Sequence, residues 1–203
     1  MFGSFYFYGF DIYYIYLVIP ALVISLIAQF KVKSTFSKYS GVSSGQLTGA
    51  DAARQVLYSH GIANVRIERV SGNLTDHYDP RTNVIRLSES VYDAASVAAV
   101  GVAAHEAGHA VQYAENYTPI VIRNKLVPVV NFGSSISWFL LLLGIFLNLD
   151  TLLWVGIALF SMTTLFHLIT LPVEFNASKR AIETLSSSSL LSDEELHGSK
   201  KVM

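Results

Sequence analysis

The five residues His105-Glu106-Ala107-Gly108-His109 carry the clearest chemistry in the sequence. If this stretch is helical, residues four apart lie about 40° apart around the axis and about 6 Å along it, so both imidazoles can bind one metal ion. Glu106 then lies beside the pair, where its carboxylate can take a proton from a metal-bound water. This H-E-x-x-H pattern predicts a zinc hydrolase that cleaves amide bonds, with Glu106 as the base.

The residues around the motif predict that it lies on a buried helix. From Ser96 to Ala114 the chain is nearly all Ala, Val and Gly up to His105, a stretch that is too long for a strand and apolar on every face. Three polar side chains buried there without partners would be strongly destabilising. A metal ion with its water supplies those partners, which favours a metal site over a chance match.

Three apolar stretches approach the roughly 20 residues that cross a bilayer. They are Ile12 to Phe30, Leu126 to Leu149 and Thr151 to Val173. The last two are so close that they form a tight hairpin. Residues 1–11 hold no Lys or Arg, so the first stretch is predicted to be a membrane helix and not a cleaved signal peptide. A net charge of −1 provides no positive field for nucleic acid, which we do not expect as a partner.

The basic residues predict how the chain is oriented. All 14 lie in two windows, Lys31 to Lys125 and Lys179 to Lys201. The positive-inside rule places both windows in the cytoplasm, with the N-terminus outside and Asp150 in an external turn. Because two spans separate the windows, residues after Val173 return to the compartment of the His pair.

A zinc hydrolase needs a third protein ligand. The chain has no cysteine, so disulfides and thiolate ligands are excluded and the ligand must be His, Asp or Glu. We favour Glu174, which follows the third span and opens a helical periodicity on which Ser178 shares its face; Ser178 or Asn176 could orient a ligand. A carboxylate that merely favours a helix start explains Glu174 equally well. The candidates on the cytoplasmic side are Asp76, His77, Asp79, Glu89, Asp93, Glu115 and Glu174.

The segment between the first and second spans predicts a small mixed domain. A Ser/Gly-rich run near residues 40–49 is typical of a flexible loop. Thr48 then caps a helix over about residues 49–60, and two short strands follow near 65–70 and 84–87. In the C-terminal tail, Ser192 before an acidic cluster predicts the start of another helix.

Five runs of residues stand out, at 48–50, 74–80, 84–88, 102–112 and 171–175. In this order they resemble the YugP-like membrane zinc metallopeptidases of bacteria, within the broader glutamate-zincin class. The resemblance covers most of the chain from residue 10 onward and implies that one Zn²⁺ is bound by His105, His109 and Glu174, with Glu106 as base. Family members usually have Asp where this chain has Asn176, and they tend to carry a further apolar span near the C-terminus, so this chain could be a shortened form.

Two further segments are candidates for substrate contacts. His77 and Tyr78 could donate hydrogen bonds to an oxyanion, although a turn held by neighbouring Asp side chains explains this loop as well. In this peptidase class an edge strand typically pairs with the substrate backbone, and a plain sheet strand is the alternative. The residues of that candidate strand are Val84, Ile85, Arg86 and Leu87.

The sequence therefore predicts a mainly α integral membrane protein with three transmembrane helices and a small α+β zincin-like catalytic domain between the first and second. The predicted divisions are residues 1–30, 31–125, 126–173 and 174–203. We expect a multi-pass zinc endopeptidase of the bacterial cell membrane that acts at the cytoplasmic face on membrane-bound or membrane-proximal polypeptides. A catalytically silent scaffold stabilised by metal is the alternative, and a metal transporter built on His167 in the third span is a third.

Overall fold

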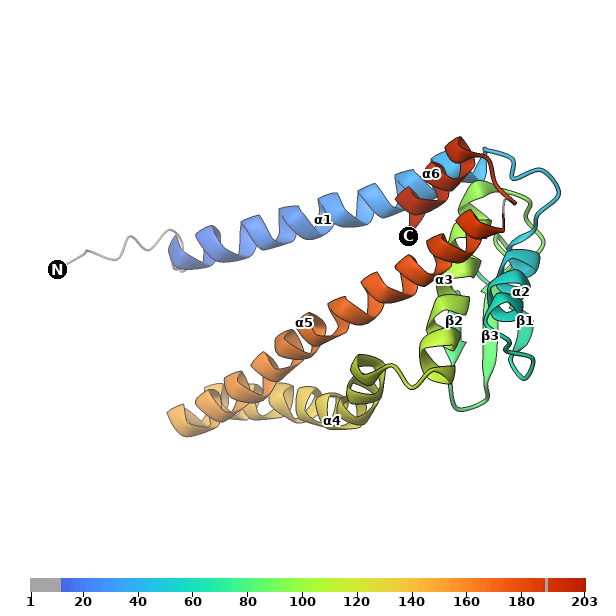
Figure 1. The fold of residues 1–203 in the computed structure, drawn as a ribbon. Coiled ribbons are helices and arrows are strands. Elements are labelled where there is room, and N and C mark those ends of the chain that lie inside the picture. Colours follow the sequence, from blue (N-terminus) through green and yellow to red (C-terminus); the bar gives the residue numbers. More distant parts are fainter. Residues whose placement is uncertain (1–11, 189) are drawn as a thin grey trace.

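The computed structural model describes residues 12–188 and 190–203, and Figure 1 shows their arrangement. The elements follow one another as long helices on either side of a small mixed domain. In chain order they are α1 (Ile12–Ser40), α2 (Gly49–Ser59), β1 (Arg66–Val70), β2 (His77–Asp79), β3 (Val84–Ser88), α3 (Val97–Ala114), α4 (Thr118–Leu147), α5 (Asp150–Ser187) and α6 (Asp193–Val202).

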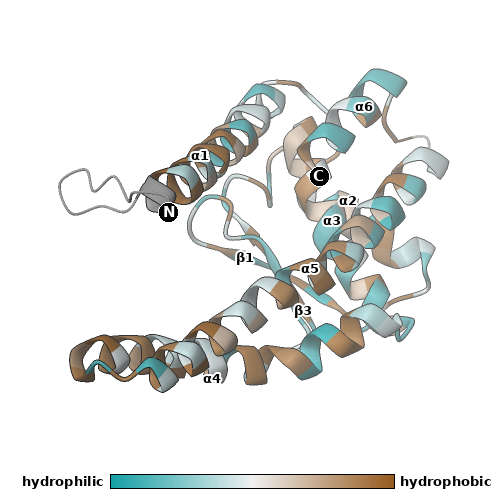
Figure 2. Cartoon of the chain, turned by 90° about the vertical axis from the view of Figure 1, so that its left-hand side faces the viewer, coloured by the Kyte–Doolittle hydropathy of each residue, from teal (hydrophilic) through white to brown (hydrophobic). Residues whose placement is uncertain are grey.

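Three of these helices, α1, α4 and α5, are long and apolar enough to cross a membrane. They extend to the same side of the mixed domain (Figure 1), and apolar residues cover most of their length (Figure 2). Many of their large apolar side chains are exposed in the structure, as expected for surfaces that face lipid. The first and third predicted spans lie within α1 and α5, and the second, Leu126 to Leu149, runs two residues past the end of α4.

Helix α5 does not end with the third span. It continues through Pro172 to Ser187, so Glu174 lies inside one unbroken helix and not at the start of a new one. Proline removes one intrahelical hydrogen bond, but the face formed by Val173, Ala177 and Ala181 is fully buried. This packing keeps the helix continuous and joins the membrane segment rigidly to the residue beside the His pair.

The hairpin between α4 and α5 turns at Asn148, as predicted. Asn148 adopts the left-handed conformation with φ 52°, and the Leu149 N–H donates to the Gly144 carbonyl at 2.9 Å. The absence of a side chain at Gly144 lets the two helices approach closely, since a Cβ there would lie 2.9 Å from Leu153 Cδ2. Small residues at such crossings are typical of packed membrane helices.

The sheet has the order β1-β3-β2, with β1 parallel and β2 antiparallel to β3. The strand over residues 84–88 is therefore central, which corrects the expectation that Val84 to Leu87 form an edge for substrate. Its main-chain groups already pair with both neighbours. The sequence did not predict β2, because three residues are too few for a strand pattern. That short strand takes the edge position and contacts α3.

Helix α3 is the centre of the domain, and α2, α5 and α6 pack around it. Its alanines at 103, 104 and 107 are fully buried. The Ser/Gly-rich run before α2 is held against the start of α3, because the Ser44 N–H donates to Ala95 O and the Val97 N–H donates to Val42 O. Thr48 caps α2 as predicted, and Ser192 and Glu195 form a capping box at α6.

Candidate metal centre

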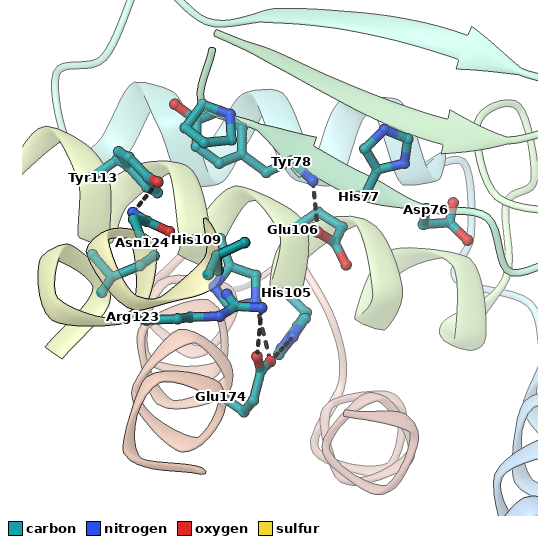
Figure 3. A pocket seen from close by; sticks show the side chains of 13 residues that line it. Asp76, His77, Tyr78, His105, Glu106, His109, Tyr113, Arg123, Asn124 and Glu174 are labelled. Atoms are coloured by element: carbon teal, nitrogen blue, oxygen red, sulfur yellow. Dashed lines mark hydrogen bonds and ion pairs between the residues drawn. The ribbon is translucent and has the colours of Figure 1, made fainter. Parts of the chain in front are cut away.

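Two helices bring His105, His109 and Glu174 together. Both histidines project from α3 toward α5, where Glu174 faces them (Figure 3). Glu174 Oε2 lies 3.3 Å from His105 Nε2 and 3.2 Å from His109 Nε2. One ligand atom from each of the three residues lies within 4.8 Å of the other two. These residues are separated by most of α4 and α5 in the sequence, so the fold alone unites them.

This donor set fits a zinc ion. Ligands at the usual zinc distances occupy tetrahedron corners about 3.4 Å apart, close to both nitrogen–oxygen separations here. Two imidazole nitrogens with one carboxylate oxygen are a common catalytic zinc set. Burial opposes protonation of His109, but its hydrogen bond to Glu174 and the charges of Glu106 and Glu174 outweigh this and raise its pKa above 6.5. The pocket therefore attracts positive charge.

The second nitrogen of each imidazole is also engaged. His105 Nδ1 lies 3.0 Å from Ser178 Oγ, and His109 Nδ1 lies 3.0 Å from Gln112 Oε1. The amide nitrogen of Gln112 donates to Val173 O and Asn176 Oδ1, at 2.7 and 3.0 Å. With its nitrogen between two acceptors, Gln112 must present oxygen to His109. His109 therefore carries its proton on Nδ1 and leaves Nε2 free for a metal.

Asn176 links this arrangement to a surface ion pair. Its Oδ1 accepts from Gln112 and also from Arg180 Nε at 2.7 Å. Arg180 pairs in turn with Glu115, and the hydrogen bond between them lowers the Glu115 pKa. One amide oxygen thus accepts both donors, so Asn176 reaches His109 only through Gln112, whereas Ser178 contacts His105 directly. Sequence reasoning missed Gln112, although its spacing of three residues after His109 puts it on the same helix face.

Replacing Gln112 with Leu is expected to weaken zinc binding about 10- to 100-fold. The change removes the acceptor that fixes the His109 tautomer and the side-chain donor to the buried Val173 carbonyl. Chelator competition on detergent-purified protein measures the affinity. Gln55→Leu on α2, which lies away from the site, is the matched control. An unchanged affinity in Gln112→Leu would show that His109 needs no such partner.

Gly108, inside the motif, sets the distance between α3 and α5. A Cβ there would lie 2.5 Å from the Ala177 carbonyl oxygen, and that atom belongs to backbone that cannot rotate away. Ala177 lies three residues after Glu174 on the same helix. The glycine is therefore what allows Glu174 to reach the histidines.

Gly108→Ala is expected to destabilise the protein by about 1–3 kcal/mol through overpacking and to reduce zinc content, because α5 must move away with Glu174. Thermal unfolding in detergent and elemental analysis measure both effects. Gly133→Ala on α4 is the control, since its Cβ would meet only Leu159 Cδ2 at 3.9 Å. A stable Gly108→Ala protein with full zinc would contradict this account.

Glu106 lies beside the metal ligands but does not join them. Its Oε2 accepts a hydrogen bond from the Tyr78 N–H of β2 at 3.0 Å. The carboxylate faces a cavity of about 360 Å³ that is also lined by both histidines and Glu174 (Figure 3). A base next to a metal position in one cavity has the arrangement that hydrolysis requires.

The two predicted oxyanion donors, His77 and Tyr78, differ in whether they are available to a substrate. His77 lines the cavity, and its Nδ1 lies 2.8 Å from the Thr75 carbonyl. The Tyr78 hydroxyl donates to Asn83 Oδ1 at 2.7 Å, and burial raises its pKa to about 12. That hydroxyl already donates its proton to Asn83 and is therefore not free to bind an oxyanion. Its ring packs edge-on against Tyr113, with centroids 5.4 Å apart.

Three of the other candidate ligands, Asp76, Asp79 and Asp93, form hydrogen bonds or ion pairs with other residues, although Asp76 also lines the cavity. The structure pairs Asp79 with Arg86, and Asp93 with Arg69. Hydrogen bonds from Thr82 and Arg86 hold the Asp79 pKa well below its usual range. Both oxygens of Asp76 accept from the Ser88 hydroxyl at 3.0 Å.

The structure adds Arg123 and Asn124 of α4 and Tyr113 of α3, which the sequence did not suggest. Arg123 Nη2 lies 3.7 Å from Glu174 Oε1, and Asn124 donates to the Tyr113 hydroxyl. All three line the cavity with the metal ligands (Figure 3). No local motif marks them, because the loop after α3 decides which face of α4 covers the site.

Comparison with known proteins agrees with this geometry. Residues 14–203 match the family model described as "Putative neutral zinc metallopeptidase". The chain is 50% identical over 192 residues to "Putative membrane protease YugP" of Bacillus subtilis (strain 168), an alignment that covers 94% of this chain and 85% of that protein. No solved structure matches the chain. Since the family model spans nearly the whole chain and the relative shares half of the aligned residues, the chain belongs to this family of neutral zinc metallopeptidases.

Proposed function

We propose that the protein is a zinc-dependent endopeptidase that binds one Zn²⁺ per chain and hydrolyses membrane-bound or membrane-proximal polypeptides. One observation carries this proposal. His105, His109 and Glu174 converge beside Glu106 in a single cavity that is also lined by two membrane-length helices, α4 and α5. The names of the family and of its Bacillus subtilis relative support the same class of activity.

Each residue has a role that follows from its position. Zinc at this site would supply a Lewis acid that acidifies a water and polarises a peptide carbonyl. Glu106, held by the Tyr78 N–H, would accept the proton of the attacking water and pass it to the leaving amine. His77 is the candidate oxyanion donor of this loop, since the Tyr78 hydroxyl is committed to Asn83. The edge of β2 would align the substrate backbone.

The location of the site relative to the bilayer is part of the proposal. Helix α5 runs from the hairpin turn to Glu174 without a break, which supports a site where the span leaves the membrane. The distribution of basic residues supports a cytoplasmic site with the N-terminus outside. A metal-stabilised scaffold would need neither the base nor an open cavity, and a transporter would need ligands within the spans, whereas both motif histidines lie on α3.

Chelation tests this function directly. Purified protein in detergent should hydrolyse unfolded casein, lose that activity with 1,10-phenanthroline and regain it when Zn²⁺ is restored. The control is the same treatment with a non-chelating phenanthroline isomer, which should leave the rate unchanged. Activity that survives removal of all measured zinc would contradict the proposal.

A further inference from the structure

A second cavity continues from the metal centre along α4. It measures about 590 Å³ and lies between the turn at Pro80–Arg81 and the α4 turns from Asn124 to Asn131. We call it the α4 cavity. It shares Pro80, Tyr113, Asn124 and Val127 with the cavity of the metal centre, so the two cavities adjoin one another. Its far end lies on the membrane-length part of α4.

Polar groups line this cavity where a bilayer would surround α4. Asn131 lies five residues beyond Leu126, the start of the predicted span, which is about 7.5 Å along the helix axis. Its side chain is exposed, and among the described residues none hydrogen-bonds to its amide. An unpaired amide at this depth is costly unless a partner pairs with it.

The backbone of α4 offers a second unpaired group at the same cavity. Pro128 has no N–H, so the carbonyl of Asn124 lacks its α-helical donor. Both residues line the cavity. One wall therefore contains a carbonyl that lacks its α-helical donor and, one turn of helix beyond Pro128, an amide that can both donate and accept. This is the pattern that pairs with an extended peptide, whose main chain alternates N–H and C=O groups.

We propose that the α4 cavity binds an extended stretch of a membrane-embedded polypeptide where it leaves the bilayer, and that Asn131 pairs with its main-chain groups. This inference rests on the proposed endopeptidase function and specifies its substrate. A helical span hides its peptide groups, so the stretch must unwind before it reaches the metal centre. Hydrogen bonds to Asn131 and the Asn124 carbonyl replace those lost on unwinding, and Val127 lies on the path between the two cavities.

Disulfide cross-linking tests binding without requiring cleavage, and the absence of cysteine in the chain gives a clean background. The full-length Glu106→Gln, Val127→Cys protein is mixed with a single-span model protein whose helix is followed by casein sequence. Single cysteines are placed along the junction of that probe, and dithiodipyridine is the oxidant. Cross-links are expected at junction positions with Val127→Cys and not with Ser161→Cys, which lies exposed on α5.

A second substitution isolates Asn131. Adding Asn131→Leu should reduce the cross-link yield about fivefold, the effect of one lost hydrogen bond, with zinc content unchanged. Ser161→Leu is the matched control. Three results would each overturn the proposal. The two cysteine positions could give equal yields, or no cross-links could form at the junction, as expected if lipid fills the cavity. The third is an Asn131→Leu protein that cross-links normally.

The same probe separates this inference from the proposed function. With Glu106 intact, cleavage near the junction should accompany the cross-links. Cross-links without cleavage would support the binding site and contradict the endopeptidase. Cleavage without specific cross-links would contradict the α4 cavity as the binding site and leave the endopeptidase intact.

Discussion

Glu106→Gln should reduce peptide hydrolysis by about 10²- to 10⁴-fold while the protein keeps its zinc. Glutamine has nearly the same shape as glutamate, and its carbonyl oxygen can still accept the Tyr78 N–H that now bonds Oε2 at 3.0 Å. The fold and the ligand set are therefore retained. What is lost is the negative charge that can accept a proton from water.

Measurements of the casein hydrolysis rate and of zinc per chain on the same preparation test this prediction. Glu68→Gln on β1 is the control, because that exposed residue forms only surface ion pairs with Arg66 and Arg86. Wild-type activity in Glu106→Gln would remove Glu106 from the mechanism. Loss of zinc in that variant would mean that Glu106 belongs to the ligand set.

Glu174→Gln is expected to lower zinc affinity by more than about 100-fold. Loss of a residue that only hydrogen-bonds to a metal ligand usually costs about 10- to 100-fold, and Glu174 is itself a ligand in this proposal. Glu174 is the carboxylate within reach of both Nε2 atoms, and an amide oxygen is a much weaker zinc ligand. Glutamine also removes the negative charge that raises the His109 pKa, so the pocket attracts cations less strongly.

Elemental analysis of freshly purified protein gives the zinc content, and chelator competition gives the affinity. The control is Glu183→Gln on the same helix, which keeps the metal centre and loses only an exposed pair with Lys179. Glu174→Gln with full zinc content would assign the third ligand to another group. Thermal unfolding of both variants shows whether zinc loss follows from the ligand or from the fold.

Much of the local structure could be predicted because it depends on neighbouring residues. Helix α2 follows from Thr48 and its periodicity, and α3 from an apolar run that is too long for a strand. The three spans follow from length and the absence of charge. Two histidines four residues apart on one helix must share a face, so half of a metal site was readable from the motif.

Other features escaped prediction because distant segments decide them. The three residues of β2 form a strand only because β3 lies beside them, and β3 is central only because β1 pairs with its other side. Helix α5 passes through Pro172 because α3 buries its next turns. In each case packing overrides a local signal.

The sequence by itself determined the chemistry of the site: a base between two histidines on one buried helix, no thiolate ligands and three apolar spans. The tertiary structure decided which carboxylate faces the histidines, that Gln112 orients His109, and that Arg123 and Asn124 of α4 line the cavity of the metal centre. The physical reason is that a motif fixes angles within one helix, whereas the meeting of α3 and α5 depends on a close contact at Gly108, far along the chain from Glu174.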